Sequence, residues 1–156
     1  MKTKVLTRPM DQDRLHEILL DMRHQLGAAF SAETAASGFP ATTPSAGHCA
    51  AVSHILSIVL GAEMASARVS GISHWFNRLH LRTGDFDFDV TGDQFGYPPI
   101  QIASAGTLYD GTRIRQFSDI NEETRRLAVL LAKRAGLPLS PAHQEGERVR
   151  EQPSET

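Results

Sequence analysis

The spacing of apolar residues changes at Gly61. Between residues 49 and 60, apolar side chains recur every three or four positions, which is typical of a buried helix. Gly61 follows directly, and a glycine at this point is a common helix terminus. Between residues 63 and 90, apolar and polar side chains alternate, which is typical of strands. We therefore expect a buried helix that is followed by a small antiparallel sheet.

Two further helices are predicted outside this region. Residues 11–30 carry apolar side chains at helical spacing, with Asp11 or Asp13 available as the N-terminal cap. Residues 121–135 show a similar pattern and have two glutamates in the first turn, where acidic side chains suit the helix dipole.

The alternating region divides into three expected strands, over residues 63–69, 73–81 and 85–90. The sequence Arg82-Thr83-Gly84-Asp85 between the last two predicts a hairpin turn. Residues 94–111 are rich in Gly, Pro and Ser and predict a long segment with at most a strand or short turn inside it. Three polar side chains of the strands are expected on a solvated face of the sheet: Arg78, Asp85 and Asp87.

The chain has 156 residues, 40% of them hydrophobic, which is enough for one domain with a core but short for two. We assign residues 1–139 to a single domain. Residues 140–156 are polar, with Val149 as the only strongly apolar side chain, and are expected to form a disordered tail.

Charge and hydropathy limit the kinds of partner and the location that we expect for this chain. Sixteen basic and eighteen acidic residues leave a net charge of −2, without a basic stretch that would follow a phosphate backbone, so we expect no nucleic-acid partner. No segment has the length and apolarity of a membrane span, and the N-terminus lacks the apolar stretch of a secretory signal. We expect no membrane association and a cytoplasmic location, where a single thiol stays reduced.

Cys49 is the only cysteine of the chain, and His74 and Asp89 follow it in that order. A thiol in the first turn of a helix lies near unpaired backbone N–H groups and the positive end of the helix dipole. Both favour the thiolate, and the same N–H groups can stabilise an oxyanion. His74 is the candidate base, and Asp89 is the candidate carboxylate that orients the imidazole. In this interpretation Cys49 is partly accessible.

The same residues have a second interpretation, because an isolated cysteine is most often inert packing in a core. His48 and His54 lie near Cys49 in the sequence, but we expect both to be structural. The seven histidines and the cysteine show no spacing typical of metal ligands, so we expect no metal and no other cofactor.

Strand pairing bears on which carboxylate accompanies His74. With Thr83-Gly84 as a two-residue loop, antiparallel pairing sets Asp93 opposite His74. A longer loop or a bulge would shift the register toward Asp89, so spacing leaves both residues open. The two-residue loop also predicts two apolar cross-strand pairs: Leu79 with Phe88, and Leu81 with Phe86.

A resemblance to known proteins rests on three segments: Gly47-His48-Cys49-Ala50-Ala51-Val52, Gly71-Ile72-Ser73-His74-Trp75-Phe76-Asn77-Arg78-Leu79, and Asp89-Val90-Thr91-Gly92-Asp93-Gln94-Phe95. They are similar to a small bacterial family described as YunG-like, over residues 31–95. Their spacing also resembles the transglutaminase-like core of the papain-like superfamily, in which a histidine-bearing strand returns through a hairpin to Asp-x-Thr.

This resemblance implies an α+β papain-like fold, with the cysteine-bearing helix packed on the antiparallel sheet and with Cys49, His74 and Asp89 as a triad. The glutamine that papain-like proteases carry shortly before the cysteine is missing here. The second oxyanion donor therefore stays open among a backbone amide and three side chains: Gln25, Thr43 and Ser45.

A Cys-His-Asp site attacks an acyl carbon, forms a thioester and passes the acyl group to water or an amine. We therefore expect a cysteine-dependent acyl-transfer enzyme: an amide hydrolase, a deamidase or an amide-forming acyltransferase. Its substrate would be a small-molecule or peptide amide or thioester, including an acyl group on a carrier. The alternative is a non-catalytic binding or regulatory module with Cys49 as packing. A redox-sensing thiol ranks third, because no second cysteine would resolve a sulfenic acid.

Overall fold

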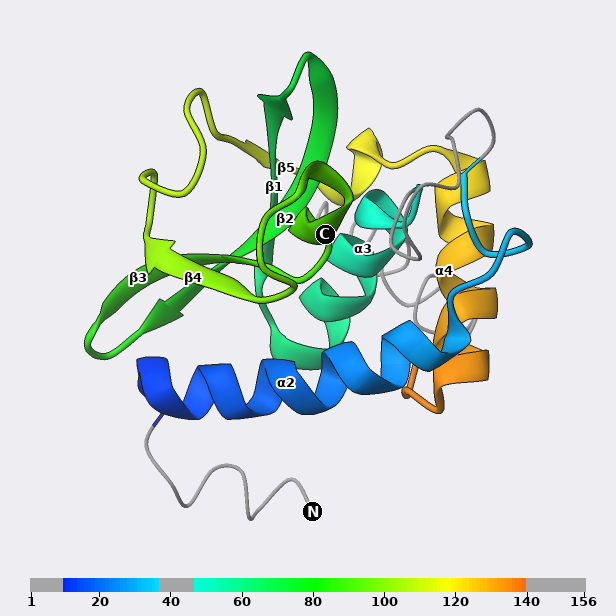
Figure 1. Cartoon of the computed structure of the whole chain (residues 1–156), viewed down its shortest axis with the longest axis horizontal. Helices are drawn as coiled ribbons and strands as arrows, with labels where there is room; N and C mark the ends of the chain where they lie inside the picture. Colours follow the sequence, from blue (N-terminus) through cyan, green and yellow to red (C-terminus); the bar gives the residue numbers. More distant parts are fainter. Residues whose placement is uncertain (1–9, 37–46, 140–156) are drawn as a thin grey trace, which may run out of the picture.

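The computed structural model describes residues 10–36 and 47–139. Within these ranges the chain forms three α-helices and a five-stranded antiparallel sheet, which confirms the α+β class (Figure 1). The tail predicted over residues 140–156 lies outside the described residues, as do Thr43 and Ser45.

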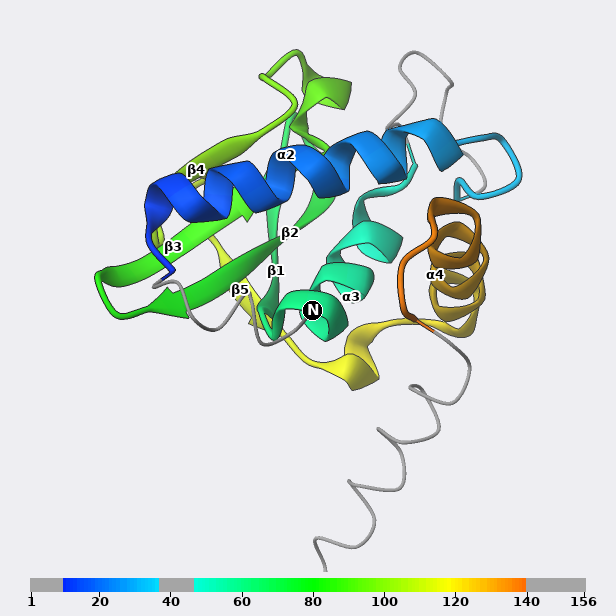
Figure 2. The same cartoon turned by 90° about the horizontal axis from the view of Figure 1, so that it is seen from below.

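The three helices form where the spacing predicts them, and they are α2 (Gln12–Ala29), α3 (Cys49–Leu60) and α4 (Glu122–Ala135). Asp11 caps α2 by accepting a hydrogen bond from the Arg14 N–H at 2.8 Å. Gly61 ends α3 with a φ of 71°, a backbone conformation that glycine adopts without steric cost. α3 packs on the sheet, and α4 packs against α3 and α2 (Figure 2).

The sheet contains the three expected strands and two shorter ones, in the order β4-β3-β2-β1-β5. The strands are β1 (Glu63–Val69), β2 (Ile72–Leu81), β3 (Gly84–Asp89), β4 (Gln101–Ser104) and β5 (Arg113–Arg115). β4 lies inside the segment predicted to be mostly irregular, and β5 was not predicted. Between β3 and β4 the 3-10 helix η1 (Gly92–Phe95) provides a short turn.

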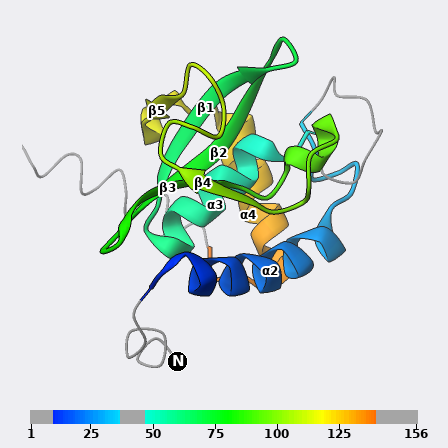
Figure 3. The ribbon, with the colours of Figure 1, turned by 60° about the vertical axis from the view of Figure 1, so that its left-hand side comes forward.

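The connection between β4 and β5 crosses one face of the sheet, because these consecutive strands lie at its two opposite edges. Figure 3 shows this connection, residues 105–112, passing over the strands. It carries Tyr109, which is buried against Phe76 of β2 with their ring centroids 5.1 Å apart. The crossing segment therefore covers the sheet where Phe76 and its neighbours would otherwise meet solvent.

Each face of the sheet consequently contributes residues to a buried core. The larger core joins the three helices to one face through Leu79, Phe88 and Val90. A smaller core forms on the other face, where Ala65 and Phe76 meet Tyr109. This arrangement explains why the strands carry large apolar residues at both alternating positions, as Phe76 and Phe88 illustrate.

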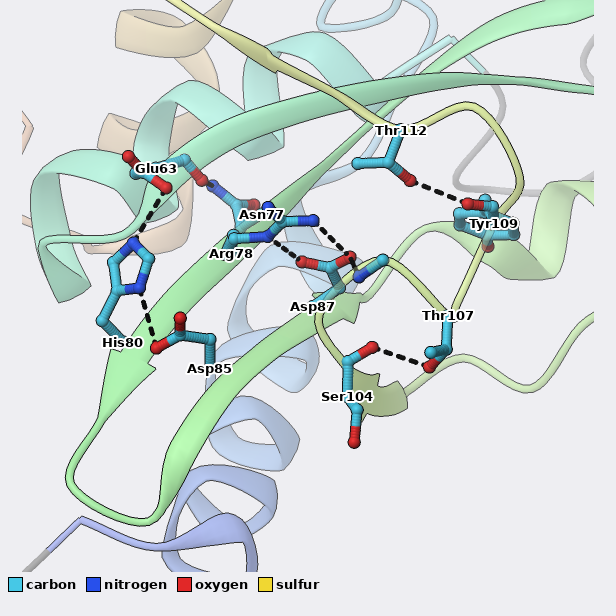
Figure 4. A network of polar contacts seen from close by, with 11 residues as sticks. Glu63, Asn77, Arg78, His80, Asp85, Asp87, Ser104, Thr107, Tyr109 and Thr112 are labelled. Carbon is cyan, nitrogen blue, oxygen red and sulfur yellow. Dashed lines mark hydrogen bonds and ion pairs between the residues drawn. The ribbon is translucent and has the colours of Figure 1, made fainter.

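The predicted solvated face is wrong for Asp87, whose side chain is fully buried. Arg78 donates two hydrogen bonds to this carboxylate, from Nε at 2.6 Å and from Nη2 at 3.1 Å (Figure 4). The backbone N–H of Gly106 donates a third, at 2.8 Å. Asp85 is exposed, as expected. The difference arises because Gly106 belongs to the crossing segment, which covers Asp87 but leaves Asp85 in solvent.

The predicted hairpin register is also wrong, by two residues. Leu79 pairs with Phe86 rather than with Phe88, and Leu81 pairs with Gly84. The loop is therefore Arg82-Thr83, one residue earlier than predicted. Gly84 has a φ of 143°, and a glycine can begin a strand in this conformation where a larger residue would be strained.

Candidate active site

Cys49 is the first residue of α3, and the residue before it is held firmly. The His48 ring stacks on Phe30 with a centroid distance of 4.2 Å, and its Nε2 lies 2.7 Å from Thr34 Oγ1. His48 is thus structural, as expected. It occupies the N-cap of α3 without a side-chain capping hydrogen bond, so no cap competes for the positive end of the helix dipole beside Cys49.

His74 lies in β2 with its side chain fully buried, and its Nε2 is 2.7 Å from Asp89 Oδ2. The register brings them together, because Asn77 pairs with Phe88 and Asp89 is the next residue of β3. Asp89 therefore points to the same face as His74, since side chains alternate along a strand. The structure thus joins two of the three residues that the sequence singles out.

Asp93, the other candidate carboxylate, has a different partner. Its Oδ2 accepts a hydrogen bond from Arg23 Nη2 of α2 at 2.8 Å. The register expected from a Thr83-Gly84 loop, which sets Asp93 opposite His74, is therefore wrong. The residue that reaches the imidazole is the aspartate of the Asp-x-Thr sequence.

The Asp89 carboxylate accepts hydrogen bonds at both oxygens. Oδ1 accepts from the backbone N–H and the hydroxyl of Thr91, at 2.9 and 3.2 Å. Oδ2 accepts from His74 and from the Tyr109 hydroxyl, the latter at 2.5 Å. A carboxylate held by four hydrogen bonds cannot rotate freely.

Tyr109 is a site residue that sequence reasoning missed. Its hydroxyl donates to Asp89 and accepts a hydrogen bond from Gln101 Nε2 at 2.8 Å. Gly92 lies against this group, because an added Cβ would be 2.8 Å from Asp89 Oδ2 and 3.1 Å from the Tyr109 oxygen. A larger residue at position 92 would therefore displace the network.

Hydrogen bonds hold both ends of the crossing segment, and they fix the position of Tyr109. At its start, the Thr107 hydroxyl donates to the Ser104 carbonyl at 2.7 Å, next to the Gly106–Asp87 hydrogen bond. At its end, the Thr112 hydroxyl donates to the Tyr109 carbonyl at 2.8 Å (Figure 4). No local sequence pattern indicates this arrangement, because it depends on which sheet edges β4 and β5 occupy.

The pKa of His74 is raised to about 9 by competing influences. Burial disfavours the imidazolium, but the hydrogen bond and charge of Asp89, together with the nearby Cys49, outweigh the effect of burial. Nε2 faces Asp89, and the other ring nitrogen, Nδ1, is buried and has no hydrogen-bond partner among the described residues. Burial, followed by the charge of Asp89, raises the pKa of Tyr109, so its hydroxyl stays protonated as a donor.

The thiol is less exposed than the sequence predicts. Cys49 has 6% of its surface exposed and is buried, although a partly accessible side chain is expected for a nucleophile. Gln25, one candidate for the second oxyanion donor, is exposed on α2. Thr43 and Ser45 lie outside the described residues, so the identity of the second donor stays a prediction.

His54 lies in α3 and takes no part in this constellation. Its side chain is buried, and neither ring nitrogen has a hydrogen-bond partner among the described residues. Burial, reinforced by the charge of Arg125, lowers its pKa to about 4. His54 is therefore a neutral core residue at pH 7, as expected. The described residues contain no group of three or more His, Cys, Asp or Glu side chains that could hold a metal ion.

A family model described as YunG protein matches residues 18–134, which include Cys49, His74 and Asp89. The chain belongs to the YunG family. Neither the curated proteins nor the solved structures give a significant match. Among the described residues of this YunG-family chain, no helix has the length and apolarity needed to cross a membrane.

Proposed function

We propose that the chain is a cysteine-dependent acyl-transfer enzyme with a papain-like, transglutaminase-like core. The observation that carries the proposal is the buried His74–Asp89 hydrogen bond, which uses Nε2 and leaves Nδ1 for the thiol of Cys49. The influence of Cys49 on the pKa of His74 supports the same assignment, because it requires the two side chains to be neighbours.

In the first half of the reaction, His74 Nδ1 takes the thiol proton and Cys49 Sγ attacks the acyl carbon of an amide or thioester. The negative charge on the acyl oxygen is stabilised by backbone N–H groups at the start of α3. The tetrahedral intermediate collapses, the bond to the leaving group breaks, and His74 donates its proton to that group. The product is a thioester on Cys49.

In the second half, His74 takes a proton from water or from an amine, which attacks the thioester carbon. The C–S bond breaks, and the thiolate of Cys49 is released beside the imidazolium. Asp89 keeps the imidazole oriented and stabilises its positive charge in both halves. Water gives hydrolysis or deamidation, and an amine gives a new amide.

The substrate class follows from this chemistry: a small-molecule or peptide amide or thioester, including an acyl group on a carrier. We place the reaction in the cytoplasm, where the single thiol would stay reduced. Burial of the site requires that substrate binding expose Sγ, since Cys49 and His74 have 6% and 0% of their surfaces exposed.

The same burial favours a second candidate, a binding or regulatory module in which Cys49 only packs. Intact mass spectrometry after incubation with a panel of acyl donors separates the two. The enzyme gains one acyl group on Cys49, and the Cys49→Ala variant folds normally but gains none. A chain that stays unmodified with every donor, and whose Cys49→Ala variant loses its fold, would support the module.

A further inference from the structure

A cavity of about 330 Å³ lies at the edge of the sheet beside the start of β5. β5 pairs with β1 only at Met64, Ala65 and Ser66, so the rest of β1 has no strand neighbour on that side among the described residues. The polar side chains that line the cavity come from β1, β2, β5 and the crossing segment. They are Ser66, Arg68, Ser73, Asp110, Arg113 and Arg115.

Two of the three arginines are oriented by hydrogen bonds to residues beside the cavity. Arg68 Nη2 donates to the Gly71 carbonyl at 2.7 Å. Arg115 Nε donates to the buried Ser66 hydroxyl at 2.7 Å, and its guanidinium lies 5.6 Å from the ring centroid of Trp75. A guanidinium has five N–H donors, so one such bond orients it and leaves donors for a ligand.

The third arginine, Arg113, is exposed, and its side chain makes no hydrogen bond or ion pair with any described residue. Asp110 is the one acidic side chain in the lining, and it forms no ion pair with the arginines within the described part of the chain. Three positive charges thus surround the cavity against one negative charge, in a chain whose net charge is −2. Such a concentration of unpaired guanidinium groups favours an anion.

We propose that this cavity binds a small molecule through a carboxylate or phosphate group. Arginine recognises both groups through paired N–H donors, and the exposed Ser73 hydroxyl adds a neutral donor. The volume suits a small ligand rather than a macromolecule. Arg68 pairs with Ser73 across β1 and β2, so both side chains lie on the same face of the sheet, opposite to the face that carries His74. Binding of the anion requires no turnover at Cys49.

The test is an NMR titration of the full chain, in which backbone amide shifts are followed as sodium phosphate or sodium acetate replaces sodium chloride at constant ionic strength. We expect saturable shifts at the cavity residues Arg68, Ser73 and Gly111. Saturation by phosphate alone assigns a phosphate group, and saturation by acetate assigns a carboxylate. The absence of saturation with both anions overturns the proposal.

Variants locate the binding. Arg113→Gln and Arg68→Gln should each weaken the anion about tenfold, because each removes a charged hydrogen-bond donor. Arg82→Gln is the matched control, since Arg82 is an exposed arginine in the β2–β3 loop, outside the cavity, and its loss should leave the affinity unchanged. Equal weakening in all three variants would show non-specific attraction to positive charge and would overturn the site.

Discussion

His74 and Asp89 are joined by a 2.7 Å hydrogen bond between Nε2 and Oδ2, with 0% and 1% of their side chains exposed. An imidazole and a carboxylate in this position hold each other in one geometry, and the carboxylate favours the charged imidazole. The pair is the part of the proposed triad that the structure defines most closely, and the first predictions concern it.

Asp89→Asn should lower the release of p-nitrophenol from p-nitrophenyl acetate by about 10³- to 10⁴-fold, because the imidazole loses the carboxylate that fixes its tautomer. The same substitution should lower the pKa of His74, measured by NMR, because it removes the hydrogen bond and charge that raise it. Asp93→Asn is the matched control and should lower this rate far less, since Asp93 binds Arg23 rather than His74. A larger loss in Asp93→Asn would transfer the orienting role to Asp93.

Tyr109→Phe tests whether the hydroxyl on Asp89 positions the triad. The phenyl ring keeps the packing against Phe76 but removes the donor to Oδ2 and leaves Gln101 without its acceptor. We expect a loss of about tenfold in the esterase rate, and about 1–3 kcal/mol in the free energy of unfolding. The pKa of His74 should rise, because a carboxylate with one donor fewer attracts the imidazolium more strongly. A fall in this pKa would show that the ring has moved from Asp89.

Local sequence patterns predict the helices and the three long strands because each carries its own signal. The spacing of the apolar residues in α3 and the alternation around Phe88 are examples. The resemblance to known proteins selected Asp89, whereas simple strand pairing favoured Asp93. The pairing failed because the position of a two-residue loop was misplaced by one residue, and this error moves every cross-strand partner by two.

The rest of the site could not be read from the sequence because it depends on topology. β4 and β5 have four and three residues, too few for a clear alternation. Their positions at opposite edges of the sheet nevertheless send the connection across its face. This crossing brings Tyr109 to Asp89 over 20 residues of sequence and buries Asp87 beneath Gly106. Neither contact can be predicted from the local spacing of apolar and polar residues.

Asp87→Ala should destabilise the fold by about 3–5 kcal/mol, because it leaves the Arg78 guanidinium without its partner in a partly buried position. It also frees the Gly106 N–H at the start of the crossing segment. Asp85→Ala is the matched control in the same strand and should cost less than about 1 kcal/mol, since its ion pair with His80 is exposed. Urea denaturation measures both. Similar losses in the two variants would mean that the crossing segment does not depend on Asp87.

Acid should destabilise the fold through His54, whose pKa is lowered to about 4 by burial and by Arg125. In the unfolded chain this imidazole takes up a proton near pH 6.5, whereas in the folded chain it stays neutral until about pH 4. Its contribution to stability is therefore complete above pH 6.5 and is lost as the pH falls from 6.5 to 4. Over this range the free energy of unfolding should fall by about 1.4 kcal/mol for each pH unit.

The measurement is urea denaturation between pH 4 and 7, comparing the parent chain with two variants. His54→Leu should flatten the dependence, because the titrating group is gone. His24→Leu is the control, since His24 is exposed on α2, and should keep the parent slope. Equal slopes in the parent and His54→Leu would contradict the assignment of acid sensitivity to His54.

Alkylation of Cys49 by iodoacetamide tests the thiolate–imidazolium pair directly. Because the pKa of His74 is raised to about 9, the imidazolium persists through neutral pH and is lost only as the pH rises through 9. If this cation holds the thiolate, the folded chain should be alkylated readily at neutral pH. In His74→Gln the cation is absent, so alkylation at neutral pH should be slower and its pH profile should change.

The same experiment in guanidinium separates reactivity from burial, because unfolding exposes Cys49 whatever its role. If the folded chain reacts only when it unfolds, and His74→Gln leaves the pH profile unchanged, Cys49 packs in the core and the thiol is not activated. Reaction of the folded chain near neutral pH, lost in His74→Gln while the guanidinium rate is unchanged, would require that His74 supplies the charge that holds the thiolate.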